Sequence, residues 1–289
     1  MNIALTGSSG LLGSNLVNDL REIGHEVLCI SSSKSSHKDA VYHYDEIATL
    51  KLNFQIDCFF HLASINSNLD KSEILLELSL MEKAIECMKD LNCKKIIFFS
   101  TSKVYGDNSF DLQEFDESSE LSPLCSYGAA KTQCEEIIQK SASNQTLDYL
   151  IFRLPPVLMD HSKSGVGKML DFVKKGIPIP SFKIGDFNQR SFLSYDLLVY
   201  VLKVTLCDLK RVDNNIFNLC DSEVISINNL LRKFGERIDK KPRIVYLPHF
   251  LFQAMIRINR LQLILCRLFG NFHISNAKLK KSFQLPEHF

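Results

Sequence analysis

Two side chains suited to proton transfer lie four positions apart in the segment "SYGAAK": the phenol of Tyr127 and the ammonium of Lys131. In a helix this spacing places both on one face, one turn apart. An unperturbed phenol has a pKa of about 10, too high for a base at neutral pH, and a neighbouring ammonium lowers that pKa because it favours the phenolate. The pair therefore predicts a tyrosine that exchanges protons with a substrate. Taken alone, the same spacing also fits an exposed helix face.

A cluster of hydroxyls precedes this pair in the chain. The segment "KKIIFFSTS" (94–102) is largely apolar until it ends at Ser100, Thr101 and Ser102. A continuous apolar run of this length is typical of a strand buried on both faces of a parallel sheet. Hydroxyls at the end of such a strand can hold a substrate oxygen close to Tyr127.

Three glycines near the N-terminus predict a dinucleotide site. In "TGSSGLLGSNL", Gly7, Gly10 and Gly13 lie between an expected strand at 2–7 and an expected helix at 11–24. Residues without Cβ let the backbone turn tightly and approach a pyrophosphate, and the N-terminus of the helix offers free N–H groups to that anion. A tight turn with no ligand is the alternative.

The end of the second expected strand, 25–33, indicates which dinucleotide binds. An acidic residue there would accept hydrogen bonds from the ribose hydroxyls of NAD, but this chain has Ser31, followed by Lys34. Hydroxyls and an ammonium suit a 2′-phosphate better than a carboxylate would. The predicted cofactor is NADP or NAD, with a slight preference for NADP.

The elements that must position these residues alternate between strand and helix. Strands are expected at 2–7, 25–33, 56–64, 94–102 and 147–155, and helices at 11–24, 72–92 and 126–143. This alternation predicts an α/β fold with a doubly wound parallel sheet, a Rossmann domain, at 1–156. Residues 157–289 then form a smaller C-terminal cap that binds substrate, with segments near 185–221 returning to the main sheet.

Composition excludes several classes of protein. Among 289 residues there are 34 Lys+Arg and 33 Asp+Glu, and this balance argues against a nucleic-acid partner. The nine cysteines form no Cys-x-x-Cys pair and no zinc spacing, which predicts a reducing compartment and no metal. The start "MNIALTGSSG" lacks the features of a signal peptide, so a cytoplasmic protein is expected.

The segment "PHFLFQAMIRINRLQLILCRLFGNF" (248–272) is the most apolar long stretch. Arg257, Arg260 and Arg267 interrupt it at helical spacing, which predicts an amphipathic helix and no stable membrane insertion. The preferred interpretation is a helix that packs on its own domain. A helix lying on a membrane surface is the alternative.

Taken together, the motifs resemble one family. "TGSSGLLG", "FFHLAS", "FFSTSKVYG", "SYGAAK", "FRLPPVL" and "RSFLSYDLLV" are similar to those of extended short-chain dehydrogenases/reductases of the NAD-dependent epimerase/dehydratase family, which act on nucleotide sugars. The resemblance implies Tyr127 as the catalytic acid/base, with Lys131 as its partner and ribose ligand. It further implies catalysis by Thr101, cofactor binding by Ala63, Lys131 and Pro155, and a grip on the substrate's diphosphate by Arg190. With the residues reasoned from local pattern, the predicted cofactor ligands are Gly7, Gly10, Leu12, Gly13, Ser31, Lys34, Leu62, Ala63, Lys131 and Pro155. Ser102 and Arg267 are further predicted substrate ligands, although Arg267 fits a surface helix arginine equally well.

One departure from the family narrows the expected activity. Dehydratases of the family carry Asp-Glu after the active-site threonine, whereas this chain has Ser102 and Lys103, so elimination of water is not expected. The tail at 250–283 resembles 4-epimerases and 4-ketoreductases that supply surface polysaccharide. The predicted activity is reduction of a nucleotide-linked 4-keto sugar, and the alternative is a 4-epimerase with tightly bound NAD.

Two further expectations concern the class of protein and its assembly. A non-catalytic dinucleotide sensor is the alternative from another class of protein, although such proteins can lose the tyrosine or lysine that this chain keeps. The resemblance also implies a homodimer formed through the helices at 72–92 and 126–142.

Overall fold

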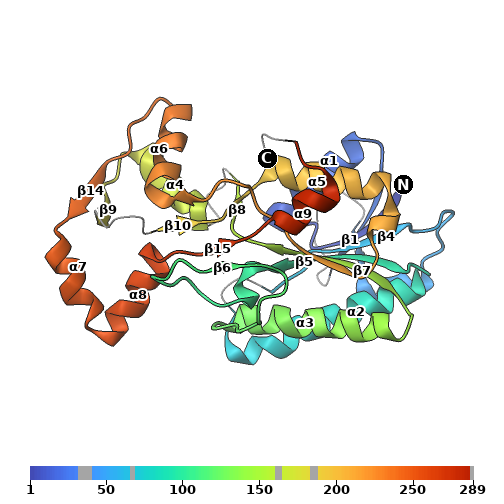
Figure 1. The fold of residues 1–289 in the computed structure, drawn as a ribbon. Coiled ribbons are helices and arrows are strands. Elements are labelled where there is room, and N and C mark those ends of the chain that lie inside the picture. Colours follow the sequence, from blue (N-terminus) through green and yellow to red (C-terminus); the bar gives the residue numbers. More distant parts are fainter. Residues whose placement is uncertain (32–40, 66–68, 160–164, 183–187, 287–289) are drawn as a thin grey trace. The chain divides into compact units, whose positions relative to one another are not determined.

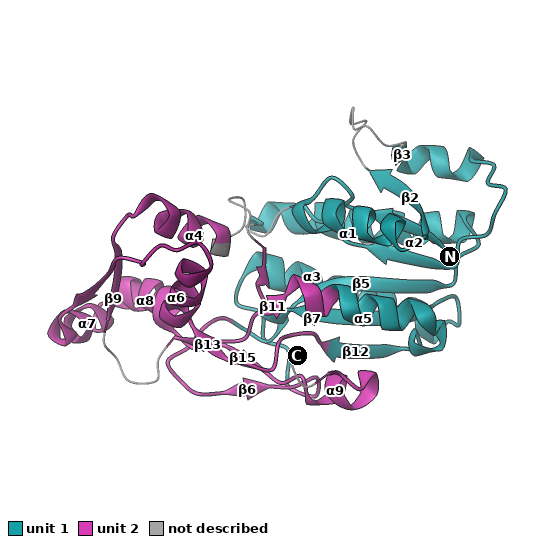
Figure 2. Cartoon of the chain, turned by 90° about the horizontal axis from the view of Figure 1, so that it is seen from above, with its two compact units in different colours: residues 1–106, 120–154, 199–217 teal, residues 107–119, 155–198, 218–289 magenta. Residues whose placement is uncertain are grey.

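The computed structural model describes residues 1–31, 41–65, 69–159, 165–182 and 188–286, which belong to two compact units (Figure 2). Unit 1 comprises Met1–Gly106, Glu120–Leu154 and Val199–Phe217, and unit 2 comprises Asp107–Ser119, Pro155–Leu198 and Asn218–Phe289. The chain thus crosses between the units several times.

Unit 1 is built on a seven-stranded sheet with the strand order β12-β7-β5-β4-β1-β2-β3 (Figure 1). Its strands are β1 (Asn2–Thr6), β2 (Glu26–Ser31), β3 (Val41–His43), β4 (Cys58–His61), β5 (Lys95–Thr101), β7 (Asp148–Leu154) and β12 (Asn215–Asn218). All pairings from β3 through β7 are parallel. The strand order reverses between β1 and β4, where doubly wound sheets bind ligands. The predicted α/β Rossmann architecture is confirmed.

Helices cover both faces of this sheet (Figure 1). On one face lie α1 (Leu11–Glu22) and α5 (Tyr195–Cys207), and on the other α2 (Ile74–Asp90) and α3 (Ser126–Ser143). Single 3₁₀ turns complete the unit: η1 (Tyr44–Thr49), η2 (Lys71–Glu73), η3 (Ser102–Val104) and η4 (Leu209–Arg211). Each helix presents apolar residues to the sheet at helical spacing, which is why the pattern of the sequence predicted them.

The main core lies between the sheet and the pair α2 and α3. Phe59 and Phe98 from the strands are completely buried there against Met81 of α2 and Ile138 of α3. The strands are apolar on both faces because helices bury both faces. This packing holds the carboxyl ends of the strands, and the loops that follow them, in place.

Unit 2 contains short strands and helices. The strands are β6 (Glu114–Phe115), β8 (Val157–Leu158), β9 (Ile179–Phe182), β10 (Gln189–Arg190), β11 (Leu193–Ser194), β13 (Ile225–Ser226), β14 (Ile244–Leu247) and β15 (His273–Ile274). The helices are α4 (Gly165–Lys175), α6 (Ile227–Arg237), α7 (His249–Ile256), α8 (Asn259–Phe269) and α9 (Ala277–Phe283). The strands pair two by two, and most are too short for their alternation to be recognised in the sequence.

The single amphipathic helix predicted within 248–272 is wrong. The chain breaks between α7 and α8, where Ile258 adopts an extended conformation. The break lets Phe252 of α7 and Leu265 of α8 bury in the same hydrophobic cluster, which also contains Phe182. Tertiary packing therefore overrides a pattern that was locally helical throughout. Within the described ranges, every helix is too short or too polar to span a bilayer.

Candidate active site

The glycine-rich turn between β1 and α1 is built so that side chains are excluded. Gly7 has a φ of 81°, and a Cβ there would lie 2.7 Å from the backbone nitrogen of Ala63. A Cβ on Gly13 would lie 2.1 Å from the carbonyl oxygen of Gly7. Only glycine fits either position, because the turn, the helix and the loop after β4 approach one another closely. The structure thus brings together Gly7, Gly13 and Ala63.

The same turn leaves the N-terminus of α1 open to an anion. Gly10 is the N-cap residue, and no side chain caps the helix there. Ser9 and Gly10 are exposed, and Leu12 is half-buried in the first turn. Uncapped N–H groups and the helix dipole favour a phosphate group at this point. The residues present therefore fit the pyrophosphate of a dinucleotide.

The carboxyl ends of the parallel strands place further predicted cofactor ligands along one edge of the sheet. Ser31 ends β2, and Leu62 and Ala63 follow β4, which neighbours β1. Lys34, predicted to favour NADP, lies outside the described residues.

Tyr127 and Lys131 lie on one face of α3, as their spacing predicted. The Nζ of Lys131 lies 5.8 Å from the centre of the Tyr127 ring and is completely buried over the ring of Phe98. Tyr127 is half-buried. Gly128 allows α3 to approach η3, because a Cβ there would lie 2.5 Å from the carbonyl oxygen of Lys103. The first turn of α3 is therefore held against the loop that follows β5.

Lys131 lowers the pKa of Tyr127 as expected, but the predicted net lowering of that pKa is wrong. Burial raises the pKa of Tyr127, the ammonium of Lys131 lowers it, and the carboxylate of Glu77 raises it again, so that the net direction is upward. Burial alone would lower the pKa of Lys131, but Tyr127 and Glu77 outweigh it and raise that pKa. A phenol in a largely apolar site is thus held protonated until a further positive charge arrives.

Glu77 is a site residue that the sequence did not reveal. Its Oε1 lies 3.0 Å from the Nζ of Lys131, and both side chains are almost completely buried. Its Oε2 accepts a hydrogen bond of 2.8 Å from the backbone N–H of Ile65, in the loop after β4. An ammonium has three N–H donors, so the ion pair with Glu77 leaves donors of Lys131 for a ligand.

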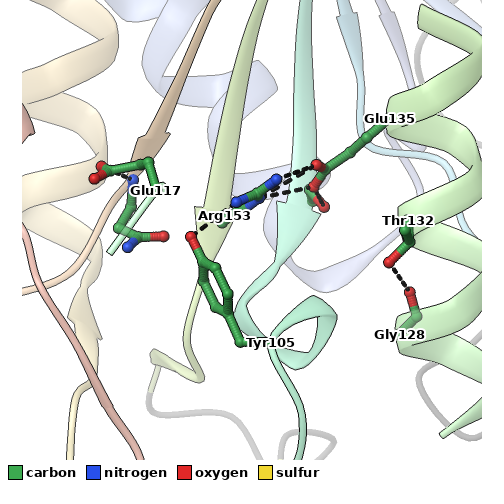
Figure 3. Close-up of polar contacts among 8 residues, drawn as sticks. Tyr105, Glu117, Gly128, Thr132, Glu135 and Arg153 are labelled. Atoms are coloured by element: carbon green, nitrogen blue, oxygen red, sulfur yellow. Dashed lines mark hydrogen bonds and ion pairs between the residues drawn. The ribbon is translucent and has the colours of Figure 1, made fainter. Parts of the chain in front are cut away.

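A second carboxylate anchors α3 to the sheet (Figure 3). Glu135, one turn beyond Lys131, forms an ion pair of 2.7 Å with Nη2 of Arg153 from β7 and accepts a hydrogen bond from Ser100. The Nη1 of Arg153 donates to the hydroxyl of Tyr105 at 2.9 Å. Arg153 and Glu135 are buried. Because Tyr127, Lys131 and Glu135 recur every four residues, this anchor fixes the face that carries the reacting pair.

The three hydroxyls at the end of β5 differ in their surroundings. Ser100 donates to Glu135 and belongs to the anchor. Thr101 is buried, and its Oγ1 accepts from the backbone N–H of Lys103 at 3.3 Å, which caps η3. Ser102 is buried in η3 itself. Thr101 is the last residue of β5, and its catalytic role stays a prediction.

Unit 2 brings together two of the predicted substrate ligands, Arg190 and Arg267. Arg190 donates from Nε to the carbonyl of Gly270 at 3.1 Å and from Nη2 to the carbonyl of Arg267 at 2.9 Å. Burial lowers the pKa of Arg190 to about 10, so it remains charged at neutral pH. The exposed Arg267 pairs with Asp107 at 3.3 Å. Pro155, the first residue after β7, is buried and also belongs to unit 2.

Comparison with known proteins identifies the family of this chain. A model of the NAD dependent epimerase/dehydratase family matches residues 3–196. The chain belongs to this family. A UDP-glucose 4-epimerase from Vibrio cholerae is 24% identical over 303 residues, covering 97% of this chain and 89% of that protein.

Solved structures of the family share the fold. A UDP-glucuronic acid 4-epimerase from Bacillus cereus in complex with NAD superimposes with a TM-score of 0.76 at 19% identity, covering 99% of this chain and 91% of that one. A UDP-glucose 4-epimerase from Thermus thermophilus in complex with NAD gives a TM-score of 0.73 at 18% identity, covering 99% and 94%. The family member described here is accordingly an NAD-dependent enzyme of the extended short-chain dehydrogenase/reductase type.

Some functional residues carried a signal in the sequence and others did not. The spacing Tyr127, Lys131, Glu135 continues one helical stripe, so Glu135 could have been found by extending it. Glu77 sits in another helix, and nothing in its local pattern indicates a buried ion pair. Arg153 looked like an ordinary residue of a strand until its partner was visible.

Proposed function

We propose that this chain is a 4-epimerase of a nucleotide-linked sugar that uses a tightly held nicotinamide dinucleotide. The observation that carries the proposal is the half-buried Tyr127 beside the buried pair of Lys131 and Glu77, in a unit whose first glycine turn excludes side chains. The relatives named above support epimerisation over the reduction that the sequence favoured.

The chemistry assigned to the chain's own residues is proton transfer and positioning. Tyr127 accepts the proton of the sugar's 4-hydroxyl as the C4–H bond breaks, and it returns that proton when the bond reforms on the other face. Thr101 holds the sugar oxygen during both steps. When bound, the nicotinamide supplies reversible acceptance of hydride from C4, and its positive charge in the oxidised form favours the phenolate of Tyr127. Lys131 keeps Tyr127 oriented and binds the ribose.

We assign the diphosphate of the substrate to Arg190 and Arg267 in unit 2. The bonds from Arg190 to the two carbonyls of the α8 end use Nε and Nη2, so Nη1 has no hydrogen-bond partner among the described residues and can reach a phosphate oxygen. A guanidinium binds phosphate with fixed geometry. In unit 1, Ser102 stays a predicted substrate ligand.

Reduction of a 4-keto sugar with NADPH is the second candidate. It is favoured by Ser31 at the end of β2, where a carboxylate would be expected in a site selective for NAD. The two candidates differ in redox balance, because a reductase consumes one reduced nicotinamide per turnover and an epimerase consumes none.

A direct experiment separates them. Purified protein is incubated with UDP-sugars without added nicotinamide, and the appearance of the 4-epimer is followed by NMR; 4-keto sugars with NADPH are followed by absorbance. Tyr127→Phe should retain dinucleotide binding and lose turnover by about 10²–10⁴-fold. Full activity of that variant in both assays would refute the proposed role of Tyr127.

We also propose a homodimer formed through α2 and α3, in a cytoplasmic protein that supplies sugars for surface polysaccharide. Support for the dimer comes from Leu75 and Leu76 of α2, two large apolar side chains that are exposed in the single chain. Burial of such side chains in a partner stabilises association. Sedimentation equilibrium of the purified protein measures its mass in solution, which we expect to equal that of two chains.

A further inference from the structure

The helices α7 and α8 of unit 2, drawn in orange and red in Figure 1, carry several exposed apolar side chains. The side chains that share this exposure are large: Phe250, Leu251, Ile258, Leu263, Ile264 and Leu268. Phe250 and Leu263 are 67% and 66% exposed. Contiguous apolar patches on the surface of soluble proteins usually mark a site of interaction. We call this set of six the α7–α8 face.

The α7–α8 face is not needed to fold unit 2. Phe252 of α7 and Leu265 of α8 point inward and are buried in one cluster. The ring of Phe252 packs against Phe110 and Phe182 with centroid distances of 5.4 and 5.2 Å. The two helices therefore have satisfied inner sides, and their outer apolar residues have another use.

The outer residues of α8 form one continuous stripe. Exposed positions 260, 263, 264, 267 and 268 follow the i, i+3, i+4, i+7, i+8 spacing of a single helix face. Arginines and large aliphatic residues occupy this stripe together. An ordinary solvated helix face would carry polar residues there, so the composition of the stripe fits a boundary between an apolar and an anionic medium.

The charge of the segment has one sign. Residues 248–272 contain three arginines and neither aspartate nor glutamate, whereas the whole chain is balanced at 34 basic and 33 acidic residues. Arg257 and Arg260, at the turn between the helices, are exposed. A partner complementary to this segment must be apolar just below a layer of negative charge. A bilayer containing anionic lipids has this structure.

We propose that the α7–α8 face docks the protein on the surface of an anionic lipid bilayer. The aliphatic and aromatic side chains enter the boundary between headgroups and acyl chains, while Arg257 and Arg260 extend to the phosphates. Arg267 is held by Asp107 and is not counted among these lipid contacts. No described helix is long and apolar enough to cross the bilayer, so the attachment is peripheral. The inference does not depend on which nucleotide sugar the enzyme uses.

The test is sedimentation of the full chain with vesicles. One set contains phosphatidylcholine alone, and the other contains phosphatidylcholine with phosphatidylserine. We expect binding to the anionic vesicles that falls with salt. Each surface arginine contributes about 1 kcal/mol, or about fivefold in affinity, so Arg257→Gln with Arg260→Gln should weaken binding by about 30-fold. Leu263→Asp with Ile264→Asp should abolish it.

Matched variants distinguish docking through the α7–α8 face from nonspecific adsorption to vesicles, from unfolding and from self-association. Leu112→Asp replaces a leucine that is 75% exposed elsewhere in unit 2 and should leave binding unchanged. The variants replace exposed residues, so their melting temperatures should match that of the wild type. Failure of the wild type to sediment with anionic vesicles would overturn the proposal. So would a change in the self-association of Leu263→Asp with Ile264→Asp, because the face would then be an interface between copies of the chain.

Discussion

Replacement of Glu77 by glutamine removes one charge from the buried ion pair while it preserves the shape of the side chain. The charges lie 3.0 Å apart, and at this separation an effective dielectric constant of about 20 gives an attraction of about 5 kcal/mol. Part of that attraction offsets the desolvation of the carboxylate, which glutamine does not require. We therefore expect Glu77→Gln to lower the free energy of unfolding by about 3 kcal/mol.

The same substitution should shift the pH dependence of activity. Glu77 raises the pKa of Tyr127, so its removal lowers that pKa, and the rise of the rate with pH moves to lower pH. Glu77 also helps to raise the pKa of Lys131. A raised lysine pKa contributes stability below the unfolded value of about 10.4 and loses it as pH rises through the folded value. The loss of stability in the variant is therefore present in full at neutral pH.

Urea unfolding at pH 7 and the pH profile of epimerisation measure the two effects. Glu223→Gln is the matched control, because Glu223 pairs with Lys233 at 2.6 Å while both side chains are more than half exposed. Removal of that exposed pair should change the free energy of unfolding by at most about 1 kcal/mol. If Glu77→Gln were as stable as Glu223→Gln and kept the wild-type profile, the reasoning about the buried pair would be refuted.

Three further predictions concern the frame around the site. Gly10→Ala should weaken dinucleotide binding with little loss of stability, because its Cβ would meet only the carbonyl oxygen of Gly7, at 3.2 Å. Gly13→Ala should lose both dinucleotide binding and stability, since its Cβ would lie 2.1 Å from the same oxygen. Calorimetric titration measures the binding, and thermal melts measure the stability. Burial, and then Lys131, lower the pKa of His61 to about 3. Below about pH 6.5 only the unfolded state binds a proton at this histidine, so the free energy of unfolding should fall by about 2 kcal/mol between pH 7 and pH 5. His61→Gln should lack this loss, and an equal pH dependence of stability in both proteins, measured by urea unfolding, would contradict it. Arg153→Met alone should lower the free energy of unfolding by about 3–5 kcal/mol, because it leaves the buried Glu135 unpaired. The double variant Arg153→Met with Glu135→Leu should recover most of this stability, which denaturant unfolding of both variants measures.

Local patterns were sufficient to predict the parallel sheet and the cofactor turn. Five strands of unit 1, namely β1, β2, β4, β5 and β7, contain apolar runs that the sequence shows directly. The three-residue β3 has no such run and was not predicted. The segment 248–272 has equally clear periodicity, yet it breaks, because Phe252 and Leu265 must reach one cluster from two helices. Where long-range packing and the local pattern conflict, the packing determines where a helix ends, and the local sequence does not reveal that end.

The buried charges of the site explain why its most important partners could not be predicted. Lys131 is matched by Glu77, and Arg153 by Glu135, so in this part of unit 1 each buried cation has one carboxylate. Glu77 comes from α2 and Arg153 from β7, so both matches depend on contacts between distant segments. Because the two pairs are neutral overall, loss of a proton from Tyr127 would leave an uncompensated negative charge. The arrangement therefore favours a protonated Tyr127. A cationic nicotinamide ring beside it would favour the phenolate, and proton transfer would then depend on the oxidised cofactor.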